Sequence, residues 1–136
     1  MSENNKEKID ELTFEGLLAL AKNEDWDAVD KLIKEFNITR KIIDWALNIG
    51  IFDEDNNVRD LATTFLDNSN IDLKATEITK LKDIMKKDTY NIVQFRTAIA
   101  LYKRGDRSTE VEEMMQKAKD DPNVSEIAKS YLINVK

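Results

Sequence analysis

The stretch FDEDNNVRDLATTF, residues 52–65, decides the fold that we expect for this chain. In its second half, apolar residues stand at positions i, i+3, i+4 and i+7, which lie on one face of an α-helix. These residues are Val58, Leu61, Ala62 and Phe65. The first half is acidic and polar, which suits a turn before a helix, because the helix dipole favours negative charge there. We therefore expect a turn that leads into a helix with one apolar stripe.

The same apolar stripe occurs four times along the chain. A second set begins 29 residues before Val58, a third begins 37 residues after it, and a fourth follows 29 residues later. The three further sets are Val29, Leu32, Ile33 and Phe36; Phe95, Ala98, Ile99 and Tyr102; and Val124, Ile127, Ala128 and Tyr131. Each set ends in an aromatic residue, so we expect the four aromatic side chains to occupy equivalent core positions.

A second helical pattern precedes each of these stripes. Its four sets are Phe14, Leu17, Leu18 and Ala21; Ile43, Ala46, Leu47 and Gly50; Ile78, Leu81, Ile84 and Met85; and Val111, Met114, Met115 and Ala118. The sequence thus predicts four helix pairs, over residues 10–37, 39–67, 75–105 and 108–135, with a polar loop over 67–74. Because a single pair cannot bury both of its faces, we expect the pairs to stack into one repeat domain over residues 1–136.

The composition agrees with helices joined by short polar turns. The 136 residues include three Gly and one Pro, and 35% are charged. The chain has no Cys and no His, which excludes disulfides, thiolate nucleophiles, zinc fingers and a Ser-His-Asp triad. The polar N-terminal sequence and the lack of an apolar run of about 20 residues predict a cytoplasmic protein without a membrane segment.

The charge is divided unevenly between the two halves of the chain. Residues 1–68 carry 8 basic and 16 acidic side chains, a net −8, whereas residues 69–136 carry 13 basic and 11 acidic ones, a net +2. Within the second half, residues 74–107 hold nine basic and four acidic side chains, a net +5. We keep a nucleic-acid contact through this basic stretch as an alternative, although a solvated helix face is favoured.

Several residues have preferences for helix ends. Thr39 is expected to cap a helix N-terminus, and Gly50 to end that helix as a C′ residue. Gly105 is expected to follow another helix C-terminus, and Thr109 with Glu112 has the spacing of a capping box.

The acidic half of the opening stretch has some features of a calcium loop. Asp53, Asp55 and Asn57 match ligand positions 1, 3 and 5 of such a loop. However, Val58 stands where the sharp turn needs Gly, and Thr64 stands where a bidentate Glu is needed. We interpret the segment as a helix-capping turn and expect neither a metal nor a cofactor. Carboxylate pairs elsewhere are interpreted as solvated helix surface, so no catalytic residue is expected.

The stretches NNVRDLATTFL and DPNVSEIAKSYL resemble the second helix of HEAT-like repeats. In that family, this helix typically begins with Asp or Asn, continues with an apolar–Arg pair and then has small residues. The matching residues in the first stretch are Asn57, Val58, Arg59 and Ala62. The first predicted pair departs from the pattern, because Asp30 stands where Arg is expected. The resemblance implies an all-α fold, a right-handed α-α superhelix (α-solenoid) of HEAT-like or armadillo type.

The resemblance also implies a concave surface, lined by the second helix of each pair, that binds a partner. The positions carried over to this surface are Lys34, Arg59, Thr63, Arg96, Ala100, Lys103 and Lys129. We therefore expect a monomeric, non-enzymatic module that binds another protein. A lyase-related HEAT-like protein is a weaker alternative, because nothing in the sequence marks a chromophore site.

Overall fold

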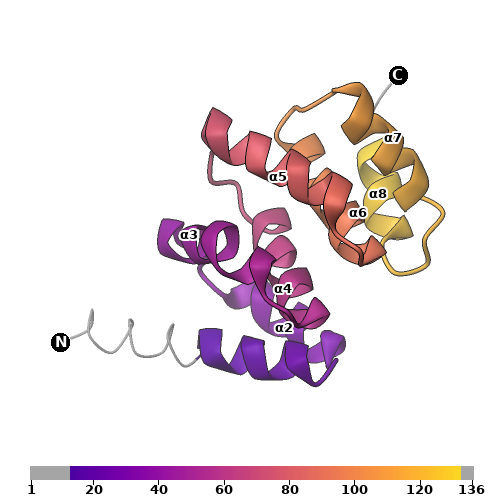
Figure 1. Cartoon of the computed structure of the whole chain (residues 1–136). Coiled ribbons are helices and arrows are strands. Elements are labelled where there is room, and N and C mark those ends of the chain that lie inside the picture. The colour runs from indigo at the N-terminus through magenta and orange to yellow at the C-terminus, as the bar shows by residue number, and fades with distance from the viewer. Residues whose placement is uncertain (1–12, 133–136) are drawn as a thin grey trace. The chain divides into compact units, whose positions relative to one another are not determined.

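The structure is a computed structural model that describes residues 13–132 (Figure 1). Its regular elements within this range are helices: residues 13–22, α2 (Trp26–Glu35), α3 (Arg40–Asn48), the 3₁₀ turn η1 (Gly50–Phe52), α4 (Asn56–Asp67), α5 (Ala75–Lys87), α6 (Asn91–Lys103), α7 (Thr109–Ala118) and α8 (Ser125–Leu132). The prediction of an all-α fold is confirmed. Among these helices, none is both long enough and apolar enough to cross a bilayer.

Each predicted pair contains two α-helices of the structure. Residues 10–12 of the first pair and residues 133–135 of the last pair lie outside the described residues. The chain divides into two compact units, Met1–Asn68 and Ser69–Lys136, and each unit contains two of the pairs. The boundary falls within the polar segment 67–74 that the sequence marks as a loop. A single repeat domain with a continuous superhelix stays a prediction.

The core of the first unit is built around Phe65 of α4, whose side chain is fully buried. The rings of Phe14, Phe36 and Trp45 surround it, with centroids at 6.0, 5.7 and 6.0 Å from that of Phe65. The rings of Trp45 and Phe14 also form an edge-to-face pair, with their centroids 4.9 Å apart. These rings come from four different helical segments, so Phe65 joins both helix pairs of the unit.

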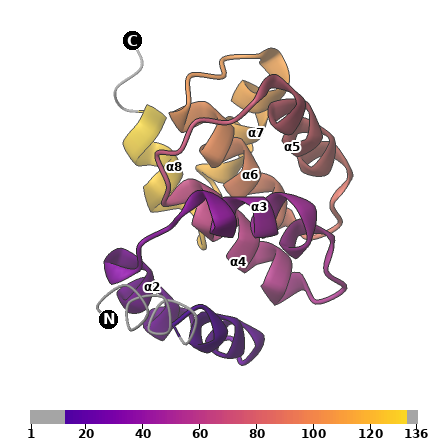
Figure 2. The same ribbon diagram turned by 90° about the vertical axis from the view of Figure 1, so that its left-hand side faces the viewer.

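The second unit is built around α6, which contacts α5, α7 and α8 (Figures 1 and 2). Residues 97–102 of α6 are all buried, and Tyr102 is only 1% exposed. Phe36 and Phe65 are buried in the first unit as well, whereas Tyr131 is half-buried. The predicted core placement therefore holds for three of the four stripe aromatics and holds in part for Tyr131.

Side chains cap the helices of the first unit as their residue types predict. Asp25, Thr39 and Asp55 accept hydrogen bonds from main-chain N–H groups at the starts of α2, α3 and α4, respectively. The capping box predicted at Thr109 is wrong. The N-cap of α7 is Ser108, whose carbonyl accepts from the Glu112 N–H at 3.0 Å, so Thr109 already lies inside the helix.

Gly50 has a role that the sequence pattern did not predict. It opens the turn η1 and does not have the positive φ of a C′ residue. A Cβ atom added there would lie 2.8 Å from the Ala62 Cβ and 2.8 Å from two atoms of the Trp45 ring. Gly50 is therefore required because α3, η1 and α4 approach one another too closely for any side chain.

Two helices end in Schellman motifs, in which the C′ residue has a left-handed conformation. At the end of α6, Gly105 has a φ of 97° and its N–H donates to the Tyr102 carbonyl, while the Asp106 N–H donates to the Leu101 carbonyl. At the end of helical residues 13–22, Glu24 takes the same position with a φ of 61°. A residue with a side chain is strained there, since its Cβ crowds the main chain.

Replacing Glu24 with glycine is expected to raise the free energy of unfolding by about 0.5–1 kcal/mol, because the left-handed strain is relieved. Replacing Gly105 with alanine should lower it by about 1 kcal/mol. No atom lies within 4 Å of a Cβ at Gly105, so the loss would come from φ alone. Urea denaturation followed by circular dichroism measures both changes. Equal effects of the same sign would contradict the assignment of the two caps.

Candidate functional site

The seven predicted partner-binding residues are divided between the two units. Lys34 on α2 and Lys129 on α8 are exposed, while Arg59, Arg96 and Lys103 are half-buried. The structure places Arg96, Ala100 and Lys103 on one face of α6, and Arg59 and Thr63 on one face of α4, both at helical spacing.

The expectation that Thr63 and Ala100 are exposed is wrong. Both are 0% exposed, and the Thr63 hydroxyl donates to the Asp60 carbonyl at 2.7 Å. The physical reason is that α4 and α6 are the central helices of their units and are buried on nearly all sides. For α6, the sequence itself indicates this burial: residues 97–102, TAIALY, are almost all apolar, and a helix that is apolar all round is typical of a protein interior.

Arg59 has a structural role in its own turn. Its guanidinium donates to the carbonyls of Asp53 and Glu54 at 2.9 and 3.2 Å and to the Asn56 Oδ1 at 2.5 Å. These bonds use the planar donor set that makes arginine suited to bidentate recognition. Arg59 therefore fixes the turn that leads into α4.

The acidic turn before α4 is held by its own carboxylates. The Asp53 Oδ1 accepts from the Asp55 N–H, and the Asp55 Oδ1 accepts from the Asn57 N–H, both at 2.8 Å. The interpretation of this segment as a helix-capping turn is confirmed. Within residues 13–132, no group of three His, Cys, Asp or Glu side chains is arranged to hold a metal ion.

A groove with a volume of about 510 Å³ opens in the second unit, between the end of α5, the start of α6 and one side of α7. Its apolar lining comes from Met85, Phe95 and Met114. Its polar lining comes from Lys86, Asn91, Gln94, Glu110, Glu113 and Lys117. The volume falls within the range of about 300–1,000 Å³ that is typical of ligand sites. This surface, the α5–α7 groove, is the candidate functional site.

Two neighbouring methionines on α7 have different environments. Met115 is fully buried in the core, whereas Met114 is half-buried and lines the α5–α7 groove. The sequence favours a core position for both, with contact to a partner as the less favoured alternative. Consecutive side chains on an α-helix point about 100° apart, so the two residues cannot face the same surroundings. Since Met85 and Phe95 are 1% and 8% exposed, Met114 supplies most of the apolar surface that a bound molecule could touch.

Asn91 and Gln94 add hydrogen-bonding capacity to the groove. They are three residues apart at the start of α6, so their side chains lie on one face of the helix. Each side-chain amide has two N–H donors and a carbonyl acceptor. The pair can therefore bind both the N–H and the C=O of a peptide backbone.

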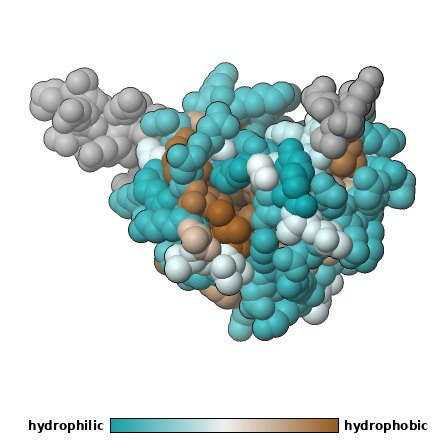
Figure 3. All heavy atoms as spheres, turned by 90° about the horizontal axis from the view of Figure 1, so that it is seen from above, coloured by the Kyte–Doolittle hydropathy of each residue, from teal (hydrophilic) through white to brown (hydrophobic). Residues whose placement is uncertain are grey.

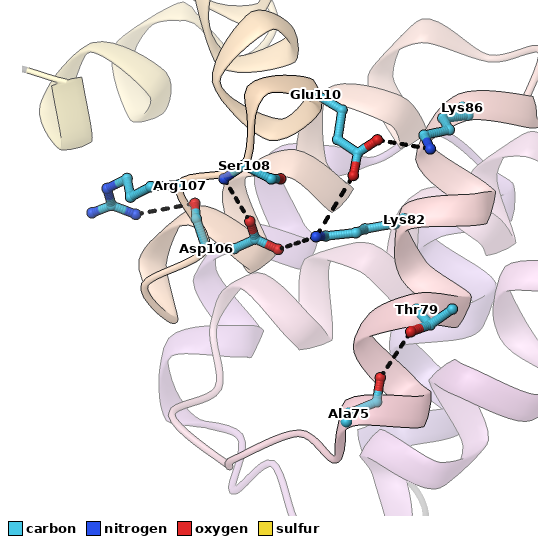
Figure 4. Close-up of polar contacts among 8 residues, drawn as sticks. All are labelled: Ala75, Thr79, Lys82, Lys86, Asp106, Arg107, Ser108 and Glu110. Carbon is cyan, nitrogen blue, oxygen red and sulfur yellow. Dashed lines mark hydrogen bonds and ion pairs between the residues drawn. The ribbon is translucent and has the colours of Figure 1, made fainter.

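Ion pairs join α5 to the start of α7 and fix one wall of the groove (Figure 4). The Lys82 ammonium lies 3.1 Å from the Asp106 carboxylate and 3.6 Å from that of Glu110. The Lys86 ammonium lies 2.7 Å from the other Glu110 oxygen. Glu110 is thus shared between two lysines one helical turn apart.

These contacts favour the charged form of each group. The hydrogen bond to Asp106 raises the pKa of Lys82. Burial acts to raise the pKa of Asp106, but hydrogen bonds from Ser108 and the Lys82 ammonium outweigh it and lower that pKa. The hydrogen bond from Lys86, supported by the charges of both lysines, lowers the pKa of Glu110.

Replacing Asp106 with asparagine is expected to lower the free energy of unfolding by about 1 kcal/mol near neutral pH, because the ion pair with Lys82 is lost. The lowered pKa of Asp106 means that this stabilisation is present above the ordinary carboxyl range. It is lost as the pH falls through the lowered value, so the difference between the two proteins should shrink in acid. Urea denaturation at a series of pH values tests this, and a pH-independent difference would contradict it.

The basic stretch 74–107 uses many of its cations within the second unit. Lys87 pairs with Asp83 at 3.0 Å, in addition to the pairs of Lys82 and Lys86. Arg104 donates to the carbonyls of Ser69, Ile71 and Ala100. Arg107 lies 3.5 Å from the centre of the Tyr102 ring and donates to the Tyr102 carbonyl. This arrangement gives the stretch a structural role.

Comparison with known proteins gives no match: no family model fits the chain, and no curated protein or solved structure is significantly similar to it. The HEAT-like resemblance therefore stays a prediction.

Proposed function

We propose that this chain is a non-enzymatic protein-binding module, and that a segment of its partner docks in the α5–α7 groove. The observation that carries the proposal is a half-exposed methionine over a Met–Phe floor, surrounded by amide and charged side chains. Methionine is enriched at protein interfaces because its flexible, polarisable side chain adapts to different partners.

The dimensions of the groove suit a short peptide segment. From Glu110 to Lys117, the α7 wall is about 10 Å long, at about 1.5 Å per helical residue. This length corresponds to about three residues of an extended chain or two turns of a helix. The Asn91 and Gln94 amides can hydrogen-bond an exposed peptide backbone, which favours the extended segment.

A HEAT-like solenoid with a concave binding face remains part of this proposal, supported by the four consecutive helix pairs. The groove is formed by α6, the second helix of its pair, together with α5 and α7, which are first helices. The proposed surface therefore differs from the predicted one, which used second helices alone.

The nucleic-acid alternative has less support than protein binding. It requires basic side chains that are available to phosphates, because phosphate contacts supply most of the non-specific affinity. Lys82, Lys86 and Lys87 already pair with carboxylates, and Arg104 and Arg107 donate to main-chain carbonyls. The cations at the centre of the stretch are thus largely committed within the unit.

Replacing Met114 with glutamate is expected to weaken partner binding at least about tenfold, because a charge would enter the apolar centre of the groove. Gln116→Glu is the matched control, since it adds the same charge on the exposed side of the same helix, outside the groove. The partner is first captured from the cells that make this protein, and its affinity for each variant is then measured by calorimetry. Equal binding by Met114→Glu and Gln116→Glu would contradict a partner site in this groove.

A further inference from the structure

The three methionines within residues 13–132 differ in their access to solvent. Met85 and Met115 are buried, whereas Met114 is half-buried and lines the α5–α7 groove. A thioether sulfur is oxidised by peroxides, and the reaction requires contact between the sulfur and the dissolved oxidant. A buried sulfur makes that contact only when the structure opens locally, which costs free energy. Met114 is therefore the methionine of this set whose sulfur a peroxide can reach in the folded protein.

The reaction of a methionine with hydrogen peroxide transfers one oxygen atom to the sulfur. The sulfur lone pair attacks one peroxide oxygen, so that an S–O bond forms while the O–O bond breaks. The leaving hydroxide takes the proton from the transferred oxygen, and the products are methionine sulfoxide and water. The sulfur loses two electrons and the peroxide gains them. A flexible apolar side chain thereby becomes a polar one that accepts hydrogen bonds.

The α5–α7 groove contains hydrogen-bond donors for a sulfoxide oxygen. Asn91 and Gln94 line it from α6, and among the residues that the structure describes neither side-chain amide has a hydrogen-bond partner. Lys117 lines it from α7, three residues after Met114, so the two side chains are neighbours on the helix surface. The two amides are those that can bind the backbone of a partner segment. A sulfoxide in the same groove would therefore compete with the partner for them.

Oxidation of Met114 would also remove the accessible apolar surface of the groove. Met85 and Phe95 form a floor that is almost closed to solvent, so apolar contact with a partner depends mainly on Met114. Over the face drawn in Figure 3, apolar atoms are likewise confined to small areas of a mostly hydrophilic surface. Where so little apolar surface is exposed, one methionine is a large share of what a partner can bury, and its loss should lower the affinity.

We propose that Met114 is a reversible oxidation site, at which a peroxide switches off docking in the α5–α7 groove. This inference rests on the proposed function, because it adds a regulation to the same docking site. The sulfoxide removes the apolar contact and adds a hydrogen-bond acceptor to the groove. Methionine sulfoxide reductases restore docking: two thiols are oxidised to a disulfide, and the sulfoxide oxygen leaves as water.

Mass spectrometry of the folded protein after treatment with hydrogen peroxide tests the modification site. Met114 should be oxidised at least about tenfold faster than Met85 and Met115. The tryptic peptide 108–117 contains both Met114 and Met115, so fragment ions are used to separate them. In urea, where all three sulfurs are exposed, the three rates should become similar. Similar rates in the folded protein, or a preference for Met114 that persists in urea, would overturn the inference.

The partner captured for the docking experiment then tests the regulation, with the peroxide removed before the partner is added. The oxidised wild type should bind it at least about tenfold more weakly, and reductases for both sulfoxide epimers, with dithiothreitol, should restore the affinity. Met114→Leu keeps an apolar side chain of similar volume without a sulfur, so it should bind equally before and after peroxide. Met115→Leu is the matched control, because it keeps Met114 and should lose binding on oxidation. Circular dichroism establishes that each protein is folded.

The outcomes also separate the inference from the proposed function. If the oxidised wild type binds the partner fully while Met114→Glu does not, the switch is wrong and the groove remains a docking site. If Met114→Leu loses binding after peroxide as the wild type does, another residue is responsible and the inference is overturned. If neither Met114→Glu nor oxidation changes partner binding, both statements are overturned.

Discussion

Replacing Phe65 with alanine is expected to lower the free energy of unfolding of the first unit by about 3–5 kcal/mol. The Phe65 ring is fully buried and is surrounded by the rings of Phe14, Phe36 and Trp45, so its removal leaves a cavity among side chains from four segments. Small domains are stable by about 5–15 kcal/mol, so this loss is a large fraction of the total. Urea denaturation followed by tryptophan fluorescence measures it, since Trp45 contacts the site.

Phe52→Ala is the control for this prediction, because it removes the same ring from a position that is 57% exposed. Its expected cost is below about 1 kcal/mol, as for most surface substitutions. Similar losses for the two variants would show that Phe65 is not the centre of the core, and the placement of both helix pairs around it would then be wrong.

Replacing Gly50 with alanine is expected to lower the free energy of unfolding by about 1–3 kcal/mol. The new Cβ would lie 2.8 Å from the Ala62 Cβ and from the Trp45 ring, so α3, η1 and α4 would have to move apart. Thermal melting of the wild type and the variant measures this loss.

Gly16→Ala is the matched control for Gly50→Ala. Gly16 lies in helical residues 13–22 and has no atom within 4 Å of an added Cβ. Alanine is a better helix former than glycine, so a gain of about 0.5–1 kcal/mol is expected. If both variants are stabilised, the close approach at Gly50 is not what requires glycine there.

The helix pairs could be predicted because their signal is local. The spacing of Val58, Leu61, Ala62 and Phe65 is repeated along the chain, and each repeat of the stripe coincides with a helix in the structure. Caps such as Thr39 are local as well, since a side chain bonds a main-chain group three residues away. Periodicity and capping therefore give the elements and their order directly.

The environment of each helix could not be predicted in the same way. A stripe indicates one buried face, but the number of neighbours around a helix depends on the tertiary structure. Thr63 and Ala100 are buried because α4 and α6 have neighbours on several sides. The prediction that Gly50 is a C′ residue is wrong for a related reason. Glycine is required there because Ala62 and Trp45 lie so close, and the local sequence around a helix end does not show that contact.

The α5–α7 groove depends on contacts between distant parts of the second unit. Met85, Phe95 and Met114 come from three helices, and the Lys82–Asp106 pair joins residues 24 positions apart in the sequence. Neither relation follows from a short motif. The sequence offers partner contact only as a less favoured alternative for Met114 and Met115 together, and the orientation of α7 is needed to tell the half-exposed Met114 from the buried Met115.

Amide hydrogen exchange of the protein, alone and with its bound partner, tests the docking groove most directly. Binding is predicted to slow exchange at the end of α5, at the start of α6 and along residues 110–117 of α7, which form the groove. The exposed surfaces at Lys34 and Lys129, which do not line it, should exchange at unchanged rates. Protection at those two surfaces without protection along residues 110–117 would contradict the account.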